Sequence, residues 1–207
     1  MLAQAQPDWP SSAVVTGFLF YDGGTEGKPL PRELEIFLAA GEPPIVFTLG
    51  SAAVLDPGNF YQESAEAARL LKRRAVLLVG QNIPPAPLPE NVVAFDYVPF
   101  SELFAKAAAI VHQGGIGTTG QALRAGRPML VMPYNFDQPD NAARLTRVSV
   151  GRTISRKRYS AESAARELTE LLNGPRYARN SAEVAQRIRR EQGAVAAAYA
   201  LERLLQR

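Results

Sequence analysis

Short apolar runs alternate with stretches of helical periodicity along most of this chain. The runs are continuous rather than alternating with polar residues, which is typical of strands in a parallel sheet covered on both faces. The predicted strands are Val14–Phe20, Ile45–Gly50, Ala75–Gly80, Val92–Val98, a run that begins at Ala109, Pro128–Pro133 and Arg152–Ile154.

The stretches between these runs predict helices. The predicted helices are Arg32–Ala40, Asn59–Arg74, Ser101–Ala108 with Ser101 as its cap, the residues after Gly117, Pro139–Val148, Ser160–Asn173 and two further segments in the tail. This alternation predicts an α/β fold with a Rossmann-like, doubly wound parallel sheet flanked by helices. Residues 1–12 are predicted to be a linker and residues 13–207 one domain, preceded in a longer protein by something that is absent here.

Composition narrows the class of protein. A length of 207 residues suits one domain with a substantial core. The net charge of +3 is too small and too dispersed for a nucleic-acid groove, and the basic residues at Arg152–Arg158 are interpreted as solvated charges. The chain has no cysteine and no run of ~18 apolar residues. We therefore expect a cytoplasmic protein with at most peripheral membrane contact.

The stretch from Ala109 to Arg144 carries the candidate chemistry. It reads as a strand, a glycine-rich turn with Gly114, Gly115 and Gly117, and a helix. Unpaired amides and the helix dipole make such a turn suitable for a phosphate. A turn that only packs a strand tightly on a helix is an equally good interpretation. The spacing is neither that of a P-loop, which needs a lysine, nor that of GxGxxG.

Polar residues around this turn have two interpretations each. His112, the only histidine, is either a structural hydrogen-bonding residue or a donor to the same anion. Asp137 and Gln138 are either a helix N-cap pair or a carboxylate and an amide for sugar hydroxyls. Ser51 ends another strand, so its turn can face the same ligand. Tyr97 is either a core aromatic or a platform for a base.

These residues together resemble a known family. The run HQGGIGTTGQALRAGRPMLVMPYNFDQPDNAAR resembles the donor-binding signature of UDP-glycosyltransferase-like enzymes with the two-domain GT-B architecture. The bacterial branch that acts on natural products, sterols and glycolipids is the most similar. The resemblance extends from the linker and VTGFLFYDGG through FTLGSAA to Gly151. It implies one half of a GT-B fold, the C-terminal nucleotide-sugar domain.

The resemblance assigns roles to individual residues. It implies that the diphosphate is bound by Ser51, His112, Gly115, Thr118 and Thr119, the base and ribose by Tyr97, Val98 and Gln121, and the hexose by Asp137 and Gln138, with Asn141 behind them. Gln121 stands where relatives often place a glutamate on the ribose. Phe100 stands where many relatives carry a glutamine.

The implied activity is a hexosyltransferase reaction. An acceptor hydroxyl, of a small molecule or a lipid, displaces the nucleoside diphosphate of a UDP- or TDP-hexose with inversion and without a metal. The sequence has no Asp-x-Asp pair for a magnesium ion, and no cofactor is expected. The general base is expected in the N-terminal acceptor domain, so no catalytic residue is assigned in this chain. We expect the chain alone to bind the nucleotide sugar but to transfer poorly.

Two other functions fit the same pattern. One is a sugar-nucleotide epimerase on the same architecture, which should need acidic and basic residues near the sugar, whereas Asp137 is the one carboxylate beside Gln138. The other is a non-catalytic subunit that binds a sugar nucleotide and depends on a separate partner for the acceptor.

Overall fold

The computed structural model describes residues 6–22 and 29–205. One sheet of parallel strands lies at the centre of these residues, in the order β3-β2-β1-β4-β5-β6. The strands are β1 (Ile45–Thr48), β2 (Ala75–Leu78), β3 (Val92–Phe95), β4 (Ala109–His112), β5 (Met129–Val131) and β6 (Gly151–Thr153). The predicted Rossmann-like parallel sheet is confirmed.

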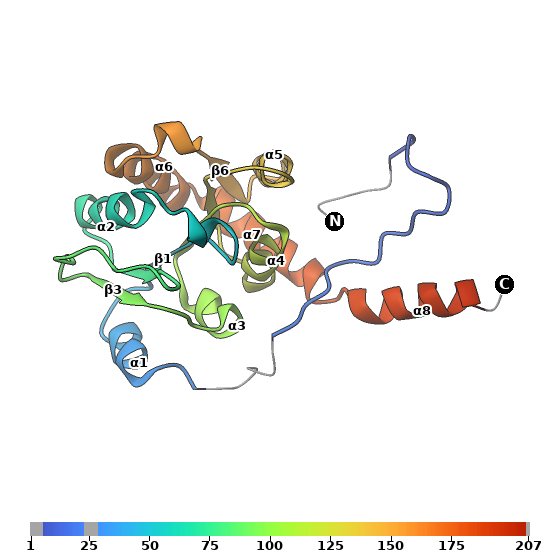
Figure 1. Ribbon diagram of the computed structural model, residues 1–207, viewed down its shortest axis with the longest axis horizontal. Helices are drawn as coiled ribbons and strands as arrows, with labels where there is room; N and C mark the ends of the chain where they lie inside the picture. The colour runs from blue at the N-terminus through green and yellow to red at the C-terminus, as the bar shows by residue number, and fades with distance from the viewer. Residues whose placement is uncertain (1–5, 23–28, 206–207) are drawn as a thin grey trace.

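Helices cover both faces of the sheet (Figure 1). They are α1 (Arg32–Ala39), α2 (Phe60–Leu70), α3 (Phe100–Leu103), α4 (Ile116–Ala125), α5 (Gln138–Arg147), α6 (Ala161–Asn173), α7 (Pro175–Ile188) and α8 (Gly193–Leu205). Short 3-10 turns η1 (Ala53–Leu55), η2 (Phe104–Lys106) and η3 (Arg156–Arg158) join them. One core cluster packs α2 and α6 on the sheet, and a second packs α1, α3, α4, α5 and α7 on its other face.

The order of the strands creates a switch point between β1 and β4. From β1 the chain adds β2 and then β3 on one side, and then returns to place β4 on the other side of β1. The connections that leave the carboxyl ends of β1 and β4 therefore diverge. In open parallel sheets, the crevice at such a point is where ligands bind.

The predicted strand Val14–Phe20 is wrong. Within the described residues, this segment pairs with no strand of the sheet. Its alternation is nevertheless real, because Phe18 and Phe20 pack against the core while Leu19 and Tyr21 are exposed. A helix, α4, takes the place of the expected neighbouring strand, since Gly120 on α4 lies against the Phe18 ring.

Two smaller predictions also need correction. Strand β3 ends at Phe95, and Val98 beyond it is fully buried in the core. Ser101 does not cap a helix: α3 begins at Phe100 directly after Pro99, whose φ of −56° suits a helix start. The Ser101 hydroxyl is buried without a hydrogen-bond partner in the part of the chain that the structure describes.

The ends of the described chain lie to one side of the sheet (Figure 1). Helix α8 projects away from the body, and the N-terminal segment passes close to its start, where the Phe18 carbonyl contacts Gly193. Within residues 6–22 and 29–205, no helix is both long enough and apolar enough to span a membrane.

Candidate functional site

The glycine turns after β1 and β4 lie against each other at the switch point. Gly50 has a φ of 64°, and a Cβ built there would lie 2.5 Å from Nε2 of Gln113 and 3.1 Å from Oγ1 of Thr118. A Cβ at Gly115 would lie 2.8 Å from the same Gln113 nitrogen. The Gln113 amide is therefore wedged between the two turns, and a side chain at Gly50 would displace it.

Helix α4 begins in this turn without a side-chain cap. Gly115 occupies the N-cap position, and no side chain of the described residues accepts a hydrogen bond there. The first backbone bond within the helix runs from the Thr119 amide to the Gly115 carbonyl, 2.9 Å away. The amides before Thr119 and the positive end of the helix dipole thus remain for an anion.

His112 is fully buried at the end of β4. Its Nδ1 accepts a hydrogen bond from the Gly114 amide at 3.0 Å, which places the proton of the neutral ring on Nε2. Burial lowers the pKa of His112 to about 3, so the ring is neutral at physiological pH. This geometry combines both interpretations of the sequence, because one nitrogen is structural and the other is a donor.

Three buried polar atoms without partners gather in this turn. His112 Nε2, Gln113 Oε1 and Thr119 Oγ1 each lack a hydrogen-bond partner within the described residues. Leaving a buried polar atom unpaired costs about 1–3 kcal/mol, and proteins rarely keep such atoms together without a reason. A ligand with several polar atoms is the kind of partner that this turn lacks.

A cleft of about 520 Å³ opens beside the turn. It brings together four of the predicted residues: Ser51, Tyr97, Thr118 and Gln121. Ser51 and Tyr97 are exposed, whereas the Thr118 side chain is buried. His112, Gly115 and Thr119 do not line the cleft, and neither does Val98, which is fully buried.

The predicted hexose residues lie on the neighbouring turn between β5 and α5. Asp137 is exposed at the N-cap position of α5, but its carboxylate does not cap the helix and instead accepts from Asn141 Nδ2 at 2.8 Å. Asn141 also donates to the Gly114 carbonyl at 2.9 Å. Gln138 is buried, and its Oε1 accepts from the Tyr134 amide at 2.8 Å. Asn141 thus joins the two turns.

Gln121 is held within a polar network on the wall of the cleft. Its Nε2 donates to Asp22 Oδ1 at 2.7 Å, and its Oε1 accepts from Arg124 Nη2 at 2.9 Å. Arg124 also donates to both oxygens of Asp22 at 2.8 Å. Both ends of the Gln121 amide are therefore already engaged.

Sequence reasoning missed Gln113 and Asp22. Gln113 stands between His112 and the glycines, but a polar residue in a turn gives no sign that it is buried. Asp22 is separated by 99 residues from Gln121 and by 102 from Arg124, so only the folded chain brings them together. The sequence signal that points to Asp22 is its position at the end of the VTGFLFYD segment, directly after alternating aromatic residues.

Comparison with known proteins places this geometry in a family. Residues 76–197 match the family described as erythromycin biosynthesis protein CIII-like, C-terminal domain. O-mycaminosyltylonolide 6-deoxyallosyltransferase of Streptomyces fradiae is 36% identical over 196 residues, which cover 94% of this chain and 46% of that protein. Sterol 3-beta-glucosyltransferase of Leptosphaeria maculans is 30% identical over 97% of this chain and 14% of its own length.

A solved structure agrees with these relatives. The crystal structure of the glycotransferase of kitacinnamycin superposes with a TM-score of 0.70 and 28% identity, covering 79% of this chain and 43% of that one. The fold is that of the C-terminal half of a GT-B glycosyltransferase. This chain belongs to the erythromycin biosynthesis protein CIII-like C-terminal domain family. It spans 46% of the length of the Streptomyces fradiae enzyme and 14% of the length of the Leptosphaeria maculans enzyme.

Proposed function

We propose that this chain is the donor-binding half of an inverting, metal-independent glycosyltransferase that moves a hexose from a UDP- or TDP-sugar to an acceptor hydroxyl. One observation carries the proposal: three buried, unpartnered polar atoms stand at the uncapped start of α4, beside an open cleft. A diphosphate offers the several acceptor oxygens that the His112 Nε2–H, the threonine hydroxyl and the helix amides need.

The site then divides into three parts. In the proposal, His112, Gly115, Thr118 and Thr119 bind the diphosphate from the β4 side, and Ser51 binds it from the β1 side. The nucleoside occupies the cleft near Tyr97 and Gln121. The hexose lies toward Asp137 and Gln138, because Asn141 connects their turn to the Gly114 carbonyl.

The proposed chemistry follows from where charge develops. The acceptor oxygen attacks the anomeric carbon, the bond from that carbon to the diphosphate oxygen breaks, and the nucleoside diphosphate leaves with the bonding electrons. The acceptor proton passes to a general base. Donors that are already aimed at the leaving group stabilise the transition state more than the ground state. Amides, hydroxyls and the neutral His112 N–H perform here the role that a metal ion performs in other transferases.

The acceptor half and the base are proposed to come from outside this domain. The single histidine of the chain is buried beneath the diphosphate turn, so it is not available to an acceptor. The names of the relatives describe transfer of a 6-deoxyallosyl group and of a glucosyl group, which favours a hexose. The acceptors in those names, a tylonolide glycoside and a sterol, favour a small molecule or lipid.

Calorimetric titration with UDP, TDP, GDP and ADP tests the proposal. We expect UDP or TDP to bind best, with an affinity that is unchanged by a chelator. Thr118→Ala should weaken binding by roughly 10- to 150-fold, the effect of losing one hydrogen bond to a charged group. His112→Ala should do the same. Glu167→Gln, which alters α6 far from the turn, is the matched control.

Three outcomes would count against the proposal. Absence of diphosphate binding by the wild-type chain would remove its basis. Unchanged affinity in both site variants would show that the nucleotide binds elsewhere. Loss of binding in the presence of chelator would overturn metal independence alone. A separate assay incubates the chain with labelled UDP-glucose and acceptor alcohols, and rapid turnover would show that the acceptor half is not needed.

A further inference from the structure

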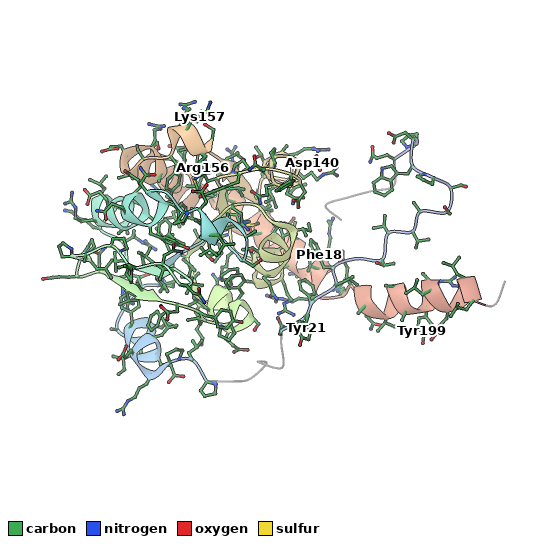
Figure 2. The ribbon with its side chains drawn as sticks, viewed as in Figure 1. Phe18, Tyr21, Asp140, Arg156, Lys157 and Tyr199 are labelled. Atoms are coloured by element: carbon green, nitrogen blue, oxygen red, sulfur yellow. The ribbon has the colours of Figure 1, made fainter. Side chains whose placement is uncertain are left out.

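A segment of the N-terminal region forms one wall of the cleft, although it belongs to no strand or helix. We call residues 17–22 the N-terminal strap. Phe18, Leu19, Phe20 and Tyr21 from the strap line the cleft together with Thr118 and Tyr97 from the body of the domain. Phe18 and Tyr21 lie where this segment runs along the body, close to the start of α8 (Figure 2).

Aromatic packing holds the middle of the strap on α4. The Phe18 and Phe20 rings stack on each other with centroids 5.6 Å apart. A Cβ built at Gly120 would lie 2.7 Å from the Phe18 ring and 3.4 Å from the Phe20 ring. The absence of a side chain at Gly120 is therefore what lets the strap lie so close to the helix.

An ion pair holds the end of the strap. Asp22 accepts two hydrogen bonds from Arg124 at 2.8 Å and one from Gln121 at 2.7 Å, and its side chain is only 8% exposed. The Arg124 guanidinium also lies 4.5 Å from the centroid of the Phe20 ring. A buried carboxylate with charged and polar partners fixes geometry strongly, because breaking the pair leaves a charge uncompensated.

The other end of the strap is tied to the C-terminal helices. The Phe18 amide donates to Glu191 Oε2 at 3.3 Å, and Gly193 at the start of α8 packs against the Phe18 carbonyl. The strap is thus attached at both ends and in its middle. Its outward residues Leu19 and Tyr21 are 66% and 87% exposed, so burial of its own side chains accounts for only part of this anchoring.

We propose that the strap is the nucleoside wall of the donor site and that Asp22 is the positioning residue that sets it. This inference rests on the proposed function, because it assigns a ligand to the same cleft. Asp22 acts through Arg124 and Gln121: it holds the aromatic wall at its distance from Tyr97 and holds the Gln121 amide in one orientation. The diphosphate turn makes none of these contacts, so the wall and the turn bind different parts of one ligand.

This division predicts which ligand's affinity depends on Asp22. In Asp22→Asn, affinity for UDP or TDP should fall by roughly 10-fold, because the wall is no longer fixed and the nucleoside must order it on binding. Affinity for inorganic pyrophosphate, which only the turn binds, should change by less than about twofold. Isothermal titration of both ligands into wild-type and variant chains measures the difference.

Two controls separate positioning from general stability. Glu167→Gln breaks a matched pair, since Arg152 and Glu167 are 2.7 Å apart and 27% and 18% exposed, compared with 2.8 Å, 23% and 8% for Arg124 and Asp22. It should leave both affinities unchanged. Gly120→Ala places a Cβ against Phe18 and displaces the strap without touching Asp22. It should reproduce the selective loss, and it serves if Asp22→Asn folds poorly.

Hydrogen exchange gives a second readout that does not depend on pyrophosphate affinity. Bound UDP should slow exchange of the backbone amides of residues 17–22 in the wild type and much less in Asp22→Asn. Three results would each overturn the role of the strap. They are equal losses of affinity for UDP and pyrophosphate, unchanged UDP affinity in both variants, and hydrogen exchange of the strap amides that does not change when UDP binds. A wild-type chain that binds neither ligand would overturn the proposed function, and the strap proposal with it.

Discussion

Two helices of this domain begin in opposite ways. At the start of α6, Ser160 and Ser163 form a reciprocal capping box, and Glu63 from α2 accepts from the Ala161 amide at 2.7 Å. At the start of α4, Gly115 has no side chain to offer, and three nearby buried polar atoms lack partners in the described residues. The chain therefore closes one helix start with its own side chains and leaves the other open.

Side-chain caps are also absent at the starts of α1, α2, α5 and α7, so what distinguishes the α4 start is the group of three buried polar atoms that lack partners within the described residues. A glycine at the N-cap costs only a few tenths of a kcal/mol relative to a capping side chain, so the glycine start of α4 leaves its amides open at little cost in stability. The same α4 turn keeps His112 neutral and buried, with Nε2 unpaired. Open and closed starts should respond in opposite ways to mutation and to ligand.

The largest effect concerns the charge on His112. Its folded-state pKa of about 3 lies below the ordinary 6.5, so its contribution to stability is present above pH 6.5 and is lost as the pH falls toward 3. The loss can reach about 1.4 kcal/mol per pH unit in that window. NMR titration of the single imidazole measures this directly. Bound UDP should raise the pKa, because a nearby anion favours the imidazolium.

An imidazole that titrates near its ordinary pKa in the free protein would contradict this prediction. It would mean that the turn is hydrated and that His112 is not confined as a neutral donor. A His112 pKa that does not change when UDP binds would place the diphosphate away from the histidine.

The next effect concerns Gln113. Gln113→Leu removes the unpartnered Oε1 and keeps a similar volume, so the free energy of unfolding should rise by about 1 kcal/mol or more. The affinity for UDP should fall, because the amide that lies between Gly50 and Gly115 is lost. Denaturant unfolding and calorimetric titration of the same sample measure the two changes. A variant that loses both stability and affinity would show that the open start is ordinary core.

A substitution at the capped start of α6 should lower stability and leave UDP affinity unchanged, in contrast to Gln113→Leu. Ser160→Ala removes one half of the capping box and should lower the free energy of unfolding by about 1 kcal/mol. Its UDP affinity should equal that of the wild type, since α6 lies on the other face of the sheet from α4. Chemical denaturation with and without UDP checks both points. Weakened UDP binding would mean that the two helix starts are coupled.

The smallest effect tests general electrostatics near the site. Asp140 lies in the first turn of α5 and pairs with Arg144 at 2.6 Å on the surface (Figure 2). Asp140→Asn should lower stability by about 0.3–0.5 kcal/mol and change UDP affinity by less than about twofold. Thermal unfolding and titration measure both. A large change in affinity would favour a diffuse field over the specific contacts of the α4 turn.

Most of the sheet was predictable from the sequence because its strands are short, continuous apolar runs bounded by turn residues, as is typical of a parallel sheet covered on both faces. The same reasoning failed at residues 14–20, where a strand-like alternation packs on α4 instead of on a strand. It also failed at Ser101, because Pro99 sets the helix start first. Local patterns do not reveal which element receives an apolar face.

The candidate site divides in the same way. Ser51 and Thr118 are predictable because the carboxyl ends of parallel strands meet at one edge of the sheet. Gln121, within α4, was predicted only from the family resemblance. The contacts of Asp22 with Gln121 and Arg124 join segments far apart in the chain, and the position of the Gln113 amide depends on its burial within a turn, so neither is visible in a local pattern. The assigned roles of these residues stay predictions until nucleotide binding is measured.

The contact between Phe18 and Gly193 has a practical consequence for hybrid enzymes. Exchanging donor domains between relatives requires a crossover point, and judged by the sequence alone the natural choice is the first strand of the sheet, at Ile45. A crossover there would combine the N-terminal strap of one parent with Gly120 on α4 and Gly193 on α8 of the other, although these glycines pack directly against the strap. Chimeras should therefore carry residues 17–22 and Gly193 from the same parent, so that crossovers fall before Gly17.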